Sequence, residues 1–325
     1  MNILVTGSSG LIGSALVDRL VADSHRVTRL VRSGRTARMT RPAPDARATS
    51  AGVSAASAPI AEVTWAPDRA TIDAAGLASS GPYDGVVHLA GAGIGDRRWS
   101  PSRKELILRS RTESTRLLVA AVLALDPRPP VLVGASAIGF YGDRGDELLT
   151  EASPRGSGFL SDVCAAWEDA LAPATDGGIR TVSLRTGIVL ASEGGVLAKQ
   201  LPIFRLGLGG RLGPGTQYQS WISLADQVGA VVYALTNGGL SGPVNAVAPN
   251  PVTNAGLTAA LAHALHRPAV LAMPSAALRL ALGREMADEL VLSSQRVSPN
   301  VLARSGFSFG TPSIAGAMAG VLRPA

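Results

Sequence analysis

Short apolar runs alternate with longer amphipathic stretches along the first half of the chain. The runs are rich in Val, Ile and Leu and too short for helices, which predicts buried strands. We expect six of them: Ile3–Thr6, Val27–Val31, Val63–Trp65, Val86–Leu89, Val131–Ala135 and Thr181–Leu184. Helical patterns lie between them, most clearly at Leu11–Ala22, Arg103–Leu125 and Phe159–Leu171. Strands that alternate with helices favour an α/β fold with a doubly wound parallel sheet.

Two stretches depart from this alternation. Residues 33–61 are rich in Ala, Ser, Arg and Pro and have no periodicity, which predicts a flexible surface insertion between the second and third strands. Gly and Pro crowd residues 205–226, which predicts a hairpin-like excursion and then a helix from Leu224. In the tail we expect helices at Ala255–Leu265 and Pro274–Leu292.

Composition narrows the class of protein. The chain has 325 residues, 46% of them hydrophobic, which is enough for a sizeable core. No apolar run reaches the roughly 18 residues that a membrane span needs, and the N-terminus shows no leader pattern. The single cysteine, Cys164, leaves no Cys cluster for a metal. We therefore expect a cytoplasmic protein without a membrane segment or a metal.

The positive charge does not indicate nucleic-acid binding. The formal net charge is +6, but the arginines are scattered along the chain rather than gathered in one stripe. Aromatic residues make up only 4%, so there is little for bases to stack on. An anionic small ligand explains a few well-placed arginines more simply.

A glycine-rich turn directly follows the first strand and directly precedes the first helix. In this G-x-x-G-x-x-G pattern Gly7 permits a tight exit from the strand, Gly10 lets the backbone approach a pyrophosphate, and Gly13 lets the helix pack closely. The helix N-terminus offers unpaired N–H groups and a partial positive charge to phosphates. The turn predicts a Rossmann-type dinucleotide site. Its contacts are expected from Gly7, Ser9, Gly10, Leu11, Ile12 and Gly13.

The end of the second strand indicates which dinucleotide binds. An acidic residue about 20 positions past the turn usually binds the ribose hydroxyls of NAD. Val31 stands at that position here, followed by Arg32 and Ser33. An acid would repel a 2′-phosphate, whereas a guanidinium binds one with two charge-assisted hydrogen bonds. We predict NADP(H) rather than NAD(H), with Arg32 and Ser33 at the 2′-phosphate; a solvated loop arginine is the alternative for Arg32.

These features suggest a division of the chain. Residues 1–244 are expected to form the nucleotide-binding domain, with residues 186–223 contributing to a substrate lobe. Residues 245–325 are expected to form a smaller C-terminal lobe. Ligands of doubly wound sheets bind at the carboxyl edge of the strands, so the lobe should lie beside that edge.

Several segments together resemble a known family. They are VTGSSGLIG, VVHLAGAGI, RRW, SRTEST, SAIGFYG, LRTGIVL and WISLAD, in that order along the chain. The set resembles an atypical, epimerase-like extended short-chain dehydrogenase/reductase of the NAD-dependent epimerase/dehydratase superfamily. The tail ELVLSSQRVSPNVLARSGFSF is similar to the domain of unknown function that ends this subfamily. The resemblance covers nearly the whole chain except residues 33–61 and implies an NADP(H)-binding Rossmann core with a small C-terminal lobe.

The resemblance also implies site residues. Leu89, Ala90 and Gly91 would pass along the nicotinamide ribose and the phosphates, and Arg111 would face the same crevice. His88, just before them, is expected to be a hydrogen-bonded strand-end histidine. Further polar and aromatic residues converge on this edge and are candidates to bind an anionic substrate or to brace loops. They are Arg97, Trp99, Arg185, Gln217 and Trp221.

The usual catalytic pair of the superfamily is missing. Its members use a Ser or Thr, a Tyr and a Lys four residues after the Tyr; the Lys lowers the pKa of the phenol and holds the ribose. Leu160 and Cys164 stand at the Tyr and Lys positions, and the chain contains no Y-x-x-x-K. Ser136 is therefore the candidate substrate-positioning hydroxyl. Tyr141 is a candidate proton donor, with a structural role as its alternative.

Two classes of function follow. The first is an NADP(H)-dependent oxidoreductase or epimerase-like enzyme that acts on an unknown small molecule. The second is a non-catalytic NADP(H)-binding redox sensor or regulatory protein, which the loss of Tyr and Lys supports. A homodimer or a regulatory protein partner is compatible with either.

Overall fold

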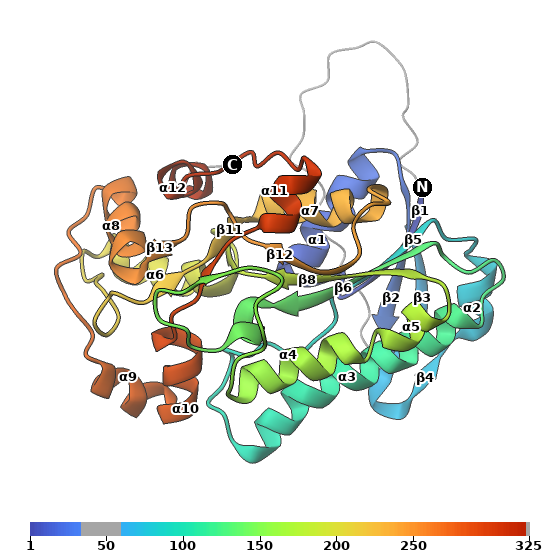
Figure 1. Cartoon of the computed structure of the whole chain (residues 1–325), viewed down its shortest axis with the longest axis horizontal. Coiled ribbons are helices and arrows are strands. Elements are labelled where there is room, and N and C mark those ends of the chain that lie inside the picture. The colour runs from blue at the N-terminus through green and yellow to red at the C-terminus, as the bar shows by residue number, and fades with distance from the viewer. Residues whose placement is uncertain (34–59, 323–325) are drawn as a thin grey trace, which may run out of the picture.

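The computed structural model describes residues 1–33 and 60–322. Its centre is an eight-stranded sheet with the order β12-β8-β6-β5-β1-β2-β3-β4 (Figure 1). The strands are β1 (Asn2–Thr6), β2 (Arg26–Arg32), β3 (Ile60–Ala66), β4 (Thr71–Ile72), β5 (Gly85–His88), β6 (Val131–Ala137), β8 (Arg180–Thr186) and β12 (Gly242–Ala246). Neighbouring strands pair in parallel except β3 and β4. The predicted α/β fold and doubly wound parallel sheet are confirmed, and all six predicted strands are present.

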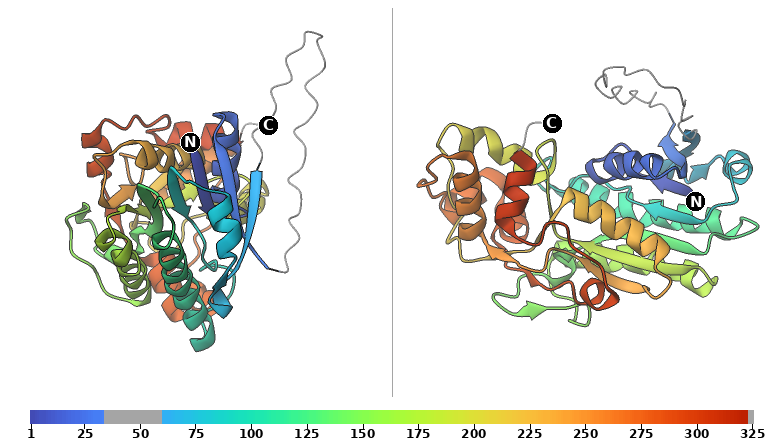
Figure 2. Two further views of the ribbon diagram at one scale, coloured as in Figure 1. Left: turned by 90° about the vertical axis from the view of Figure 1, so that its right-hand side faces the viewer. Right: turned by 90° about the horizontal axis from the view of Figure 1, so that it is seen from above.

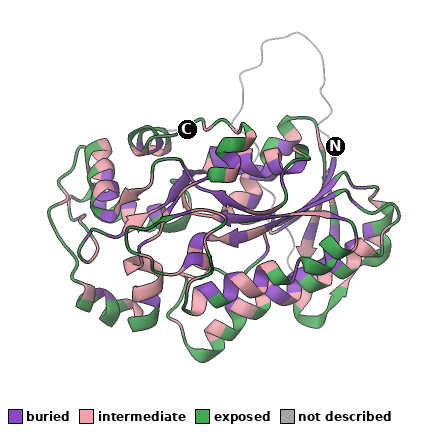
Figure 3. Ribbon diagram, in the orientation of Figure 1, coloured by how far each residue is buried: buried purple, intermediate pink, exposed green. Residues whose placement is uncertain are grey.

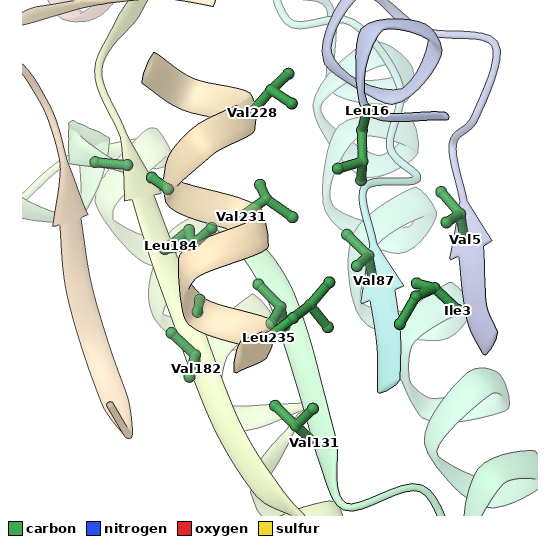
Figure 4. Close-up of a cluster of buried hydrophobic side chains, with 14 of the residues drawn as sticks. Ile3, Val5, Leu16, Val87, Val131, Val182, Leu184, Val228, Val231 and Leu235 are labelled. Atoms are coloured by element: carbon green, nitrogen blue, oxygen red, sulfur yellow. The ribbon is translucent and has the colours of Figure 1, made fainter. Parts of the chain in front are cut away.

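The sheet is buried on both faces by helices. Residues of β1 alternate, with Ile3 and Val5 in one core cluster and Leu4 in another. On the first face α1 (Leu11–Ala22) and α7 (Leu224–Thr236) cover the sheet. Figure 4 shows Leu16 and Val231 of these helices close to Val87 of β5. Burial on both faces explains why these strands read as continuous apolar runs.

The opposite face carries the other helices of the first half. They are α2 (Ala74–Ser79), α3 (Pro101–Leu123), α4 (Phe159–Asp169) and α5 (Ala172–Asp176). Ser100 caps α3 by accepting a hydrogen bond from the Arg103 backbone N–H, and Pro101 fits its first turn. The predicted helix 159–171 ends two residues early, and a new helix begins with Pro173 in its first turn.

The predicted hairpin-like excursion is wrong. Within it β10 (Tyr218–Gln219) pairs with β13 (Val252–Thr253), and β11 (Trp221–Ser223) pairs with β9 (Ile188–Leu190). Both partners are distant in the sequence, so local patterns did not indicate them. The helix predicted from Leu224 is present as α7, and the Ser223 side chain caps it.

Most of the C-terminal helices gather at one end of the molecule (Figure 2), whereas the helix at Asn300–Ser305 packs on the sheet, where Leu302 joins the same core cluster as α7. The structure has α6 (Gly195–Arg205), α8 (Asn254–Leu265), α9 (Ser275–Leu282), α10 (Arg284–Ala287), a π-helical turn η3 (Asp288–Leu292), α11 (Asn300–Ser305) and α12 (Ile314–Leu322). The single helix predicted over 274–292 is broken because Gly283 adopts a φ of +88°. Two short strands, β7 (Leu148–Leu149) and β14 (Arg296–Val297), join this part to the loop after β6.

Two boundaries predicted from the sequence fall inside observed strands. The division at 244/245 falls inside β12, so the sheet itself includes Asn245. The predicted insertion lies mostly in residues 34–59, outside the described residues, while Ile60 and Ala61 already belong to β3. Figure 3 shows that burial is concentrated in the sheet and in the inner sides of its helices. Whether the C-terminal lobe is a separate domain stays a prediction.

Candidate functional site

The glycine turn after β1 is packed so closely that two of its glycines have no room for a side chain. Gly7 has a φ of +69°, and a Cβ there would lie 2.6 Å from the carbonyl carbon of Leu89. A Cβ on Gly13 would lie 2.2 Å from the Gly7 oxygen, whereas one on Gly10 would come no closer than 3.4 Å. Gly7 and Gly13 therefore fix the turn, and Gly10 leaves an open side.

The N-terminus of α1 opens on that side. Gly10 is its N-cap and provides no side-chain hydrogen bond, so the first N–H groups of the helix are left for another acceptor. Ser9 and Gly10 are exposed, and Leu11 and Ile12 are half-buried. An oriented, uncapped first turn beside a glycine bend suits a pyrophosphate. The residues present therefore fit a dinucleotide.

The loop after β5 packs directly against the glycine turn. The Leu89 N–H donates to the Thr6 hydroxyl at 3.2 Å, and Leu89 is the residue that a Cβ on Gly7 would meet. His88 is fully buried and hydrogen-bonds the hydroxyls of Thr6 (2.7 Å) and Thr115 (3.0 Å). Burial lowers the pKa of His88 to about 3, so the ring is neutral. The structure thus brings Leu89 and Ala90 against the turn, and the predicted contact of Leu89, Ala90 and Gly91 with the nicotinamide ribose and the phosphates stays a prediction.

The end of β2 lies on the other side of the turn. Arg32 and Ser33 are exposed there, and their contact with a 2′-phosphate stays a prediction. Arg29 was not predicted from the sequence to lie here; its Nε donates to the Ser8 hydroxyl at 3.1 Å and its Nη1 lies 3.6 Å from Glu62. An arginine inside a buried strand was the signal that could have drawn attention to it.

Leu160 and Cys164 lie on α4 beside the 3₁₀ turn η2 (Ile138–Tyr141) that follows β6. A Cβ on Gly139 would be 3.3 Å from Leu160 Cβ and 3.7 Å from Cys164 Sγ. Burial raises the pKa of the Cys164 thiol to about 12, so it stays protonated. Neither side chain performs the proton chemistry of a Tyr–Lys pair.

A buried polar network joins the two candidate catalytic residues. The Ser136 hydroxyl donates to Glu168 Oε1 at 2.6 Å, and Arg185 binds both oxygens of Glu168 at 2.8 Å. Arg185 also donates to the Tyr141 hydroxyl at 3.1 Å, which donates in turn to Asn245 at 2.7 Å. Burial raises the pKa of the Tyr141 phenol, against the opposing effect of Arg185. Tyr141 is fully buried and supports the network from the interior, which corresponds to its structural alternative.

Three predicted substrate contacts lie in the interior. Arg185 is 4% exposed, and its guanidinium forms an ion pair with Glu168. Gln217 is buried and donates to the carbonyl oxygens of Leu212 and Val291. Trp221 is fully buried and donates to the Asn250 carbonyl at 3.1 Å. Arg185 is thus part of the network around Glu168, while Gln217 and Trp221 bind backbone carbonyls of distant segments; a contact of any of the three with a substrate stays a prediction.

The loop with Arg97 and Trp99 crosses to the C-terminal part. Trp99 donates to the Ile94 carbonyl at 2.9 Å and meets the Phe159 ring edge-on, with centroids 5.1 Å apart. Arg98 donates to the carbonyl oxygens of Leu280 and Ala281 at the end of α9. Arg97 is exposed.

Beside this loop lies a cavity of about 400 Å³ lined by Trp99, Ser100, Pro101, Lys104, Glu105, Leu108, Phe159 and Glu285.

Arg111 on α3 faces the loop after β5. Its Nη1 donates to the carbonyl oxygens of Ala92 and Ile107, both at 3.0 Å. The guanidinium carbon lies 4.9 Å from the centroid of the Trp167 ring. Burial lowers the pKa of Arg111 to about 10, which leaves it charged at neutral pH.

The C-terminal part supplies two further contacts that the sequence did not indicate. Glu289 accepts hydrogen bonds from the backbone N–H groups of Phe159 (2.9 Å) and Leu160 (2.8 Å) at the start of α4. Asp226, at the start of α7, accepts from the N–H groups of Gly310 and Thr311. The start of α4 is therefore held by a carboxylate from the C-terminal part.

Residues 1–33 and 60–322 contain neither a candidate metal centre nor a candidate membrane span. Over these ranges, no three His, Cys, Asp or Glu side chains come close enough to hold a metal ion together. None of the helices there combines the length and hydropathy of a membrane crossing.

Comparison with known proteins gives matches over nearly the whole chain. Residues 3–247 match the NAD dependent epimerase/dehydratase family, and residues 273–321 match a domain of unknown function (DUF1731). The chain is 42% identical over 307 residues to Epimerase family protein Mb2239 of Mycobacterium bovis, covering 94% of this chain and 93% of that one.

Solved structures agree with these matches. The crystal structure of human epimerase family protein SDR39U1 (isoform 2) with NADPH has a TM-score of 0.81 at 30% identity, over 99% of both chains. A nucleoside-diphosphate sugar epimerase from Corynebacterium glutamicum has a TM-score of 0.72 at 34% identity, over 99% of this chain and 58% of that one.

Proposed function

This chain belongs to the NAD dependent epimerase/dehydratase family, and from that premise we propose that it is an NADP(H)-dependent oxidoreductase or epimerase-like enzyme acting on a small molecule. The observation that carries the proposal is the glycine turn, where Gly7 and Gly13 leave no room for a Cβ and the first turn of α1 is uncapped. The human relative, whose structure contains NADPH, supports the choice of NADP(H).

Each part of the cofactor has candidate partners. The turn from Gly7 to Gly13 would hold the pyrophosphate, Arg32 and Ser33 the 2′-phosphate, and Leu89–Gly91 with Arg111 the nicotinamide side. When bound, the reduced nicotinamide supplies a hydride. A small molecule is the expected partner, and a homodimer or a regulatory protein partner stays a further proposal.

Ser136 is proposed to orient the substrate oxygen. Its hydroxyl donates to Glu168; its oxygen would accept a hydrogen bond from a substrate hydroxyl, and its O–H would turn from Glu168 to donate to a substrate carbonyl. Glu168 is held in place by Arg185, and Arg185 by Tyr141. Tyr141 is therefore assigned a positioning role rather than that of proton donor. The proton that the substrate oxygen gains or loses would come from or pass to water.

A second candidate function is a non-catalytic NADP(H)-binding sensor or regulator. The observation in its favour is the start of α4, where Leu160 and a protonated Cys164 replace the proton-transferring pair and Glu289 occupies the backbone N–H groups. Such a protein would use the same glycine turn but carry out no hydride transfer.

The two candidates can be separated with the full chain. NADPH binding is measured by calorimetry, and NADPH oxidation is followed with a panel of aldehydes, ketones and quinones. We expect turnover of at least one of these substrates. Ser136→Ala should abolish this turnover and keep the affinity for NADPH. The matched control Ser79→Ala, exposed on α2, should change neither. Tight binding without turnover on any substrate would favour the regulator. Absence of binding to either pyridine nucleotide would overturn both.

A further inference from the structure

A positive charge is missing from α4. In the Tyr-x-x-x-Lys pattern the lysine holds the ribose on the nicotinamide side and supplies a cation beside the reacting centre. Cys164 stands at that position and is buried with a protonated thiol. If this chain binds the dinucleotide as proposed, another group must hold that ribose or the ribose is left without a charged partner.

Arg111 brings a cation against α4 from a different helix. Its charge acts on the Cys164 thiol, lowering the thiol pKa against the larger, raising effect of burial. Its guanidinium stacks on Trp167, which is three residues beyond Cys164 on α4. On its other side, a Cβ on Gly91 would lie 3.3 Å from the Arg111 guanidinium carbon. The guanidinium therefore lies between α4 and the loop after β5.

The hydrogen bonds of Arg111 leave part of the guanidinium free to bind a ligand. Nη1 donates to Ala92 and Ile107, while Nε and Nη2 make no hydrogen bond within residues 1–33 and 60–322. No carboxylate in those ranges pairs with it either. The guanidinium is half-buried, so a ligand that supplies acceptors to Nε and Nη2 would be stabilised by charge-assisted hydrogen bonds.

We propose that Arg111 replaces the missing lysine, and that from α3 its guanidinium binds the hydroxyls of the nicotinamide-side ribose. This inference rests on the proposed NADP(H) binding. Arginine suits the position because its planar group stacks on Trp167 and keeps its charge when buried. The ribose-binding cation is thus moved from α4 to α3, and the proton-transferring phenol has no equivalent on α4.

Ligand fragments test this placement without an activity assay. NADPH contains the second ribose; adenosine 2′-phosphate 5′-diphosphate contains the 2′-phosphate and a pyrophosphate but no second ribose. We expect Arg111→Met to weaken NADPH about tenfold or more, as for the loss of a charged hydrogen bond. The same variant should leave the affinity for the fragment unchanged. Arg116→Met, exposed on the same helix, is the matched control.

Each outcome decides the inference. Equal weakening of NADPH and the fragment would place Arg111 at the pyrophosphate and overturn it, as would unchanged NADPH binding. If Arg111→Met strongly lowers the melting temperature, the same two affinities are measured for Arg111→Lys. That variant should bind NADPH less tightly than wild type but more tightly than Arg111→Met, and should bind the fragment as wild type does. Failure of the wild-type chain to bind NADPH would instead refute the proposed function.

Discussion

Gly10 and Gly13 stand three residues apart in one turn, yet an added methyl group would meet different surroundings. On Gly13 it would lie 2.2 Å from the Gly7 oxygen, so Gly13→Ala should lower the free energy of unfolding by about 1–3 kcal/mol. Gly10 has a φ of −82° and room for a Cβ, so Gly10→Ala should cost about 1 kcal/mol or less. Both should weaken NADPH binding; urea unfolding and calorimetry measure the two effects. Equal destabilisation would contradict the assigned contacts.

Arg32 is the residue on which the choice of cofactor depends. If its guanidinium binds the 2′-phosphate, Arg32→Ala should weaken NADPH at least about tenfold and leave NADH nearly unchanged, because NADH lacks that phosphate. Titration of both nucleotides into wild type and variant checks this. Arg26→Ala, exposed at the start of the same strand, is the control. Equal weakening of both nucleotides would make Arg32 an ordinary solvated arginine.

His88 should give the folded state a pH dependence of its own. Burial lowers its pKa from 6.5 to about 3, so between these values the unfolded chain binds a proton that the folded chain does not. Its contribution to stability is complete above pH 6.5 and is lost as the pH falls through this window, at up to about 1.4 kcal/mol per pH unit. His88→Asn should flatten the plot of unfolding free energy against pH there. Parallel plots for the two proteins would refute this role.

Residue types alone indicated part of the site. The glycine turn could be predicted because its three glycines lie within seven consecutive residues, directly between a strand and a helix. Asn245 and Glu289 were not, because their partners Tyr141 and the start of α4 are more than a hundred positions away. Arg185 and Trp221 were predicted either to bind a substrate or to brace loops, because polar and aromatic residues near a crevice suit both uses. Only the fold decides between those uses.

At the scale of elements, strands buried on both faces were the easiest to predict. Their apolar runs are continuous, and α1 was predicted at the bounds it has, Leu11–Ala22. Elements that depend on distant pairing were missed. The segment of β10 and β11 was expected to fold on itself, but each strand pairs with another part of the chain. The helix predicted over 274–292 was interrupted by the left-handed conformation of Gly283.

The start of α4 depends on Glu289. Two backbone N–H groups donate to its carboxylate, which also lies at the positive end of the helix. Glu289→Ala should lower the unfolding free energy by about 1–2 kcal/mol, and Glu289→Gln by less, because an amide oxygen still accepts. Hydrogen exchange at Phe159 and Leu160 should accelerate in Glu289→Ala. Unchanged exchange at both amides, with Glu193→Gln as an exposed control, would contradict the cap.

At the scale of the whole molecule, the two predicted parts share hydrogen bonds that neither could complete alone. Asn245 of the sheet donates to the Ser298 carbonyl, and Glu151 accepts from the backbone N–H groups of Asn245 and Val301. Asp226 holds residues 310 and 311 in the same way. Loss of the C-terminal part would leave these buried groups without partners.

We therefore expect the chain to unfold as one cooperative unit even though residues 245–325 look like a separate lobe. Far-UV and near-UV circular dichroism should report one urea transition with a single midpoint. Removing residues 273–325 should prevent cooperative folding of the remainder, because β7 would lose β14 and α4 would lose Glu289. Two resolved transitions, or a truncated chain that still binds NADPH with unchanged affinity, would show instead that the sheet domain is independent and that the lobe only covers its edge.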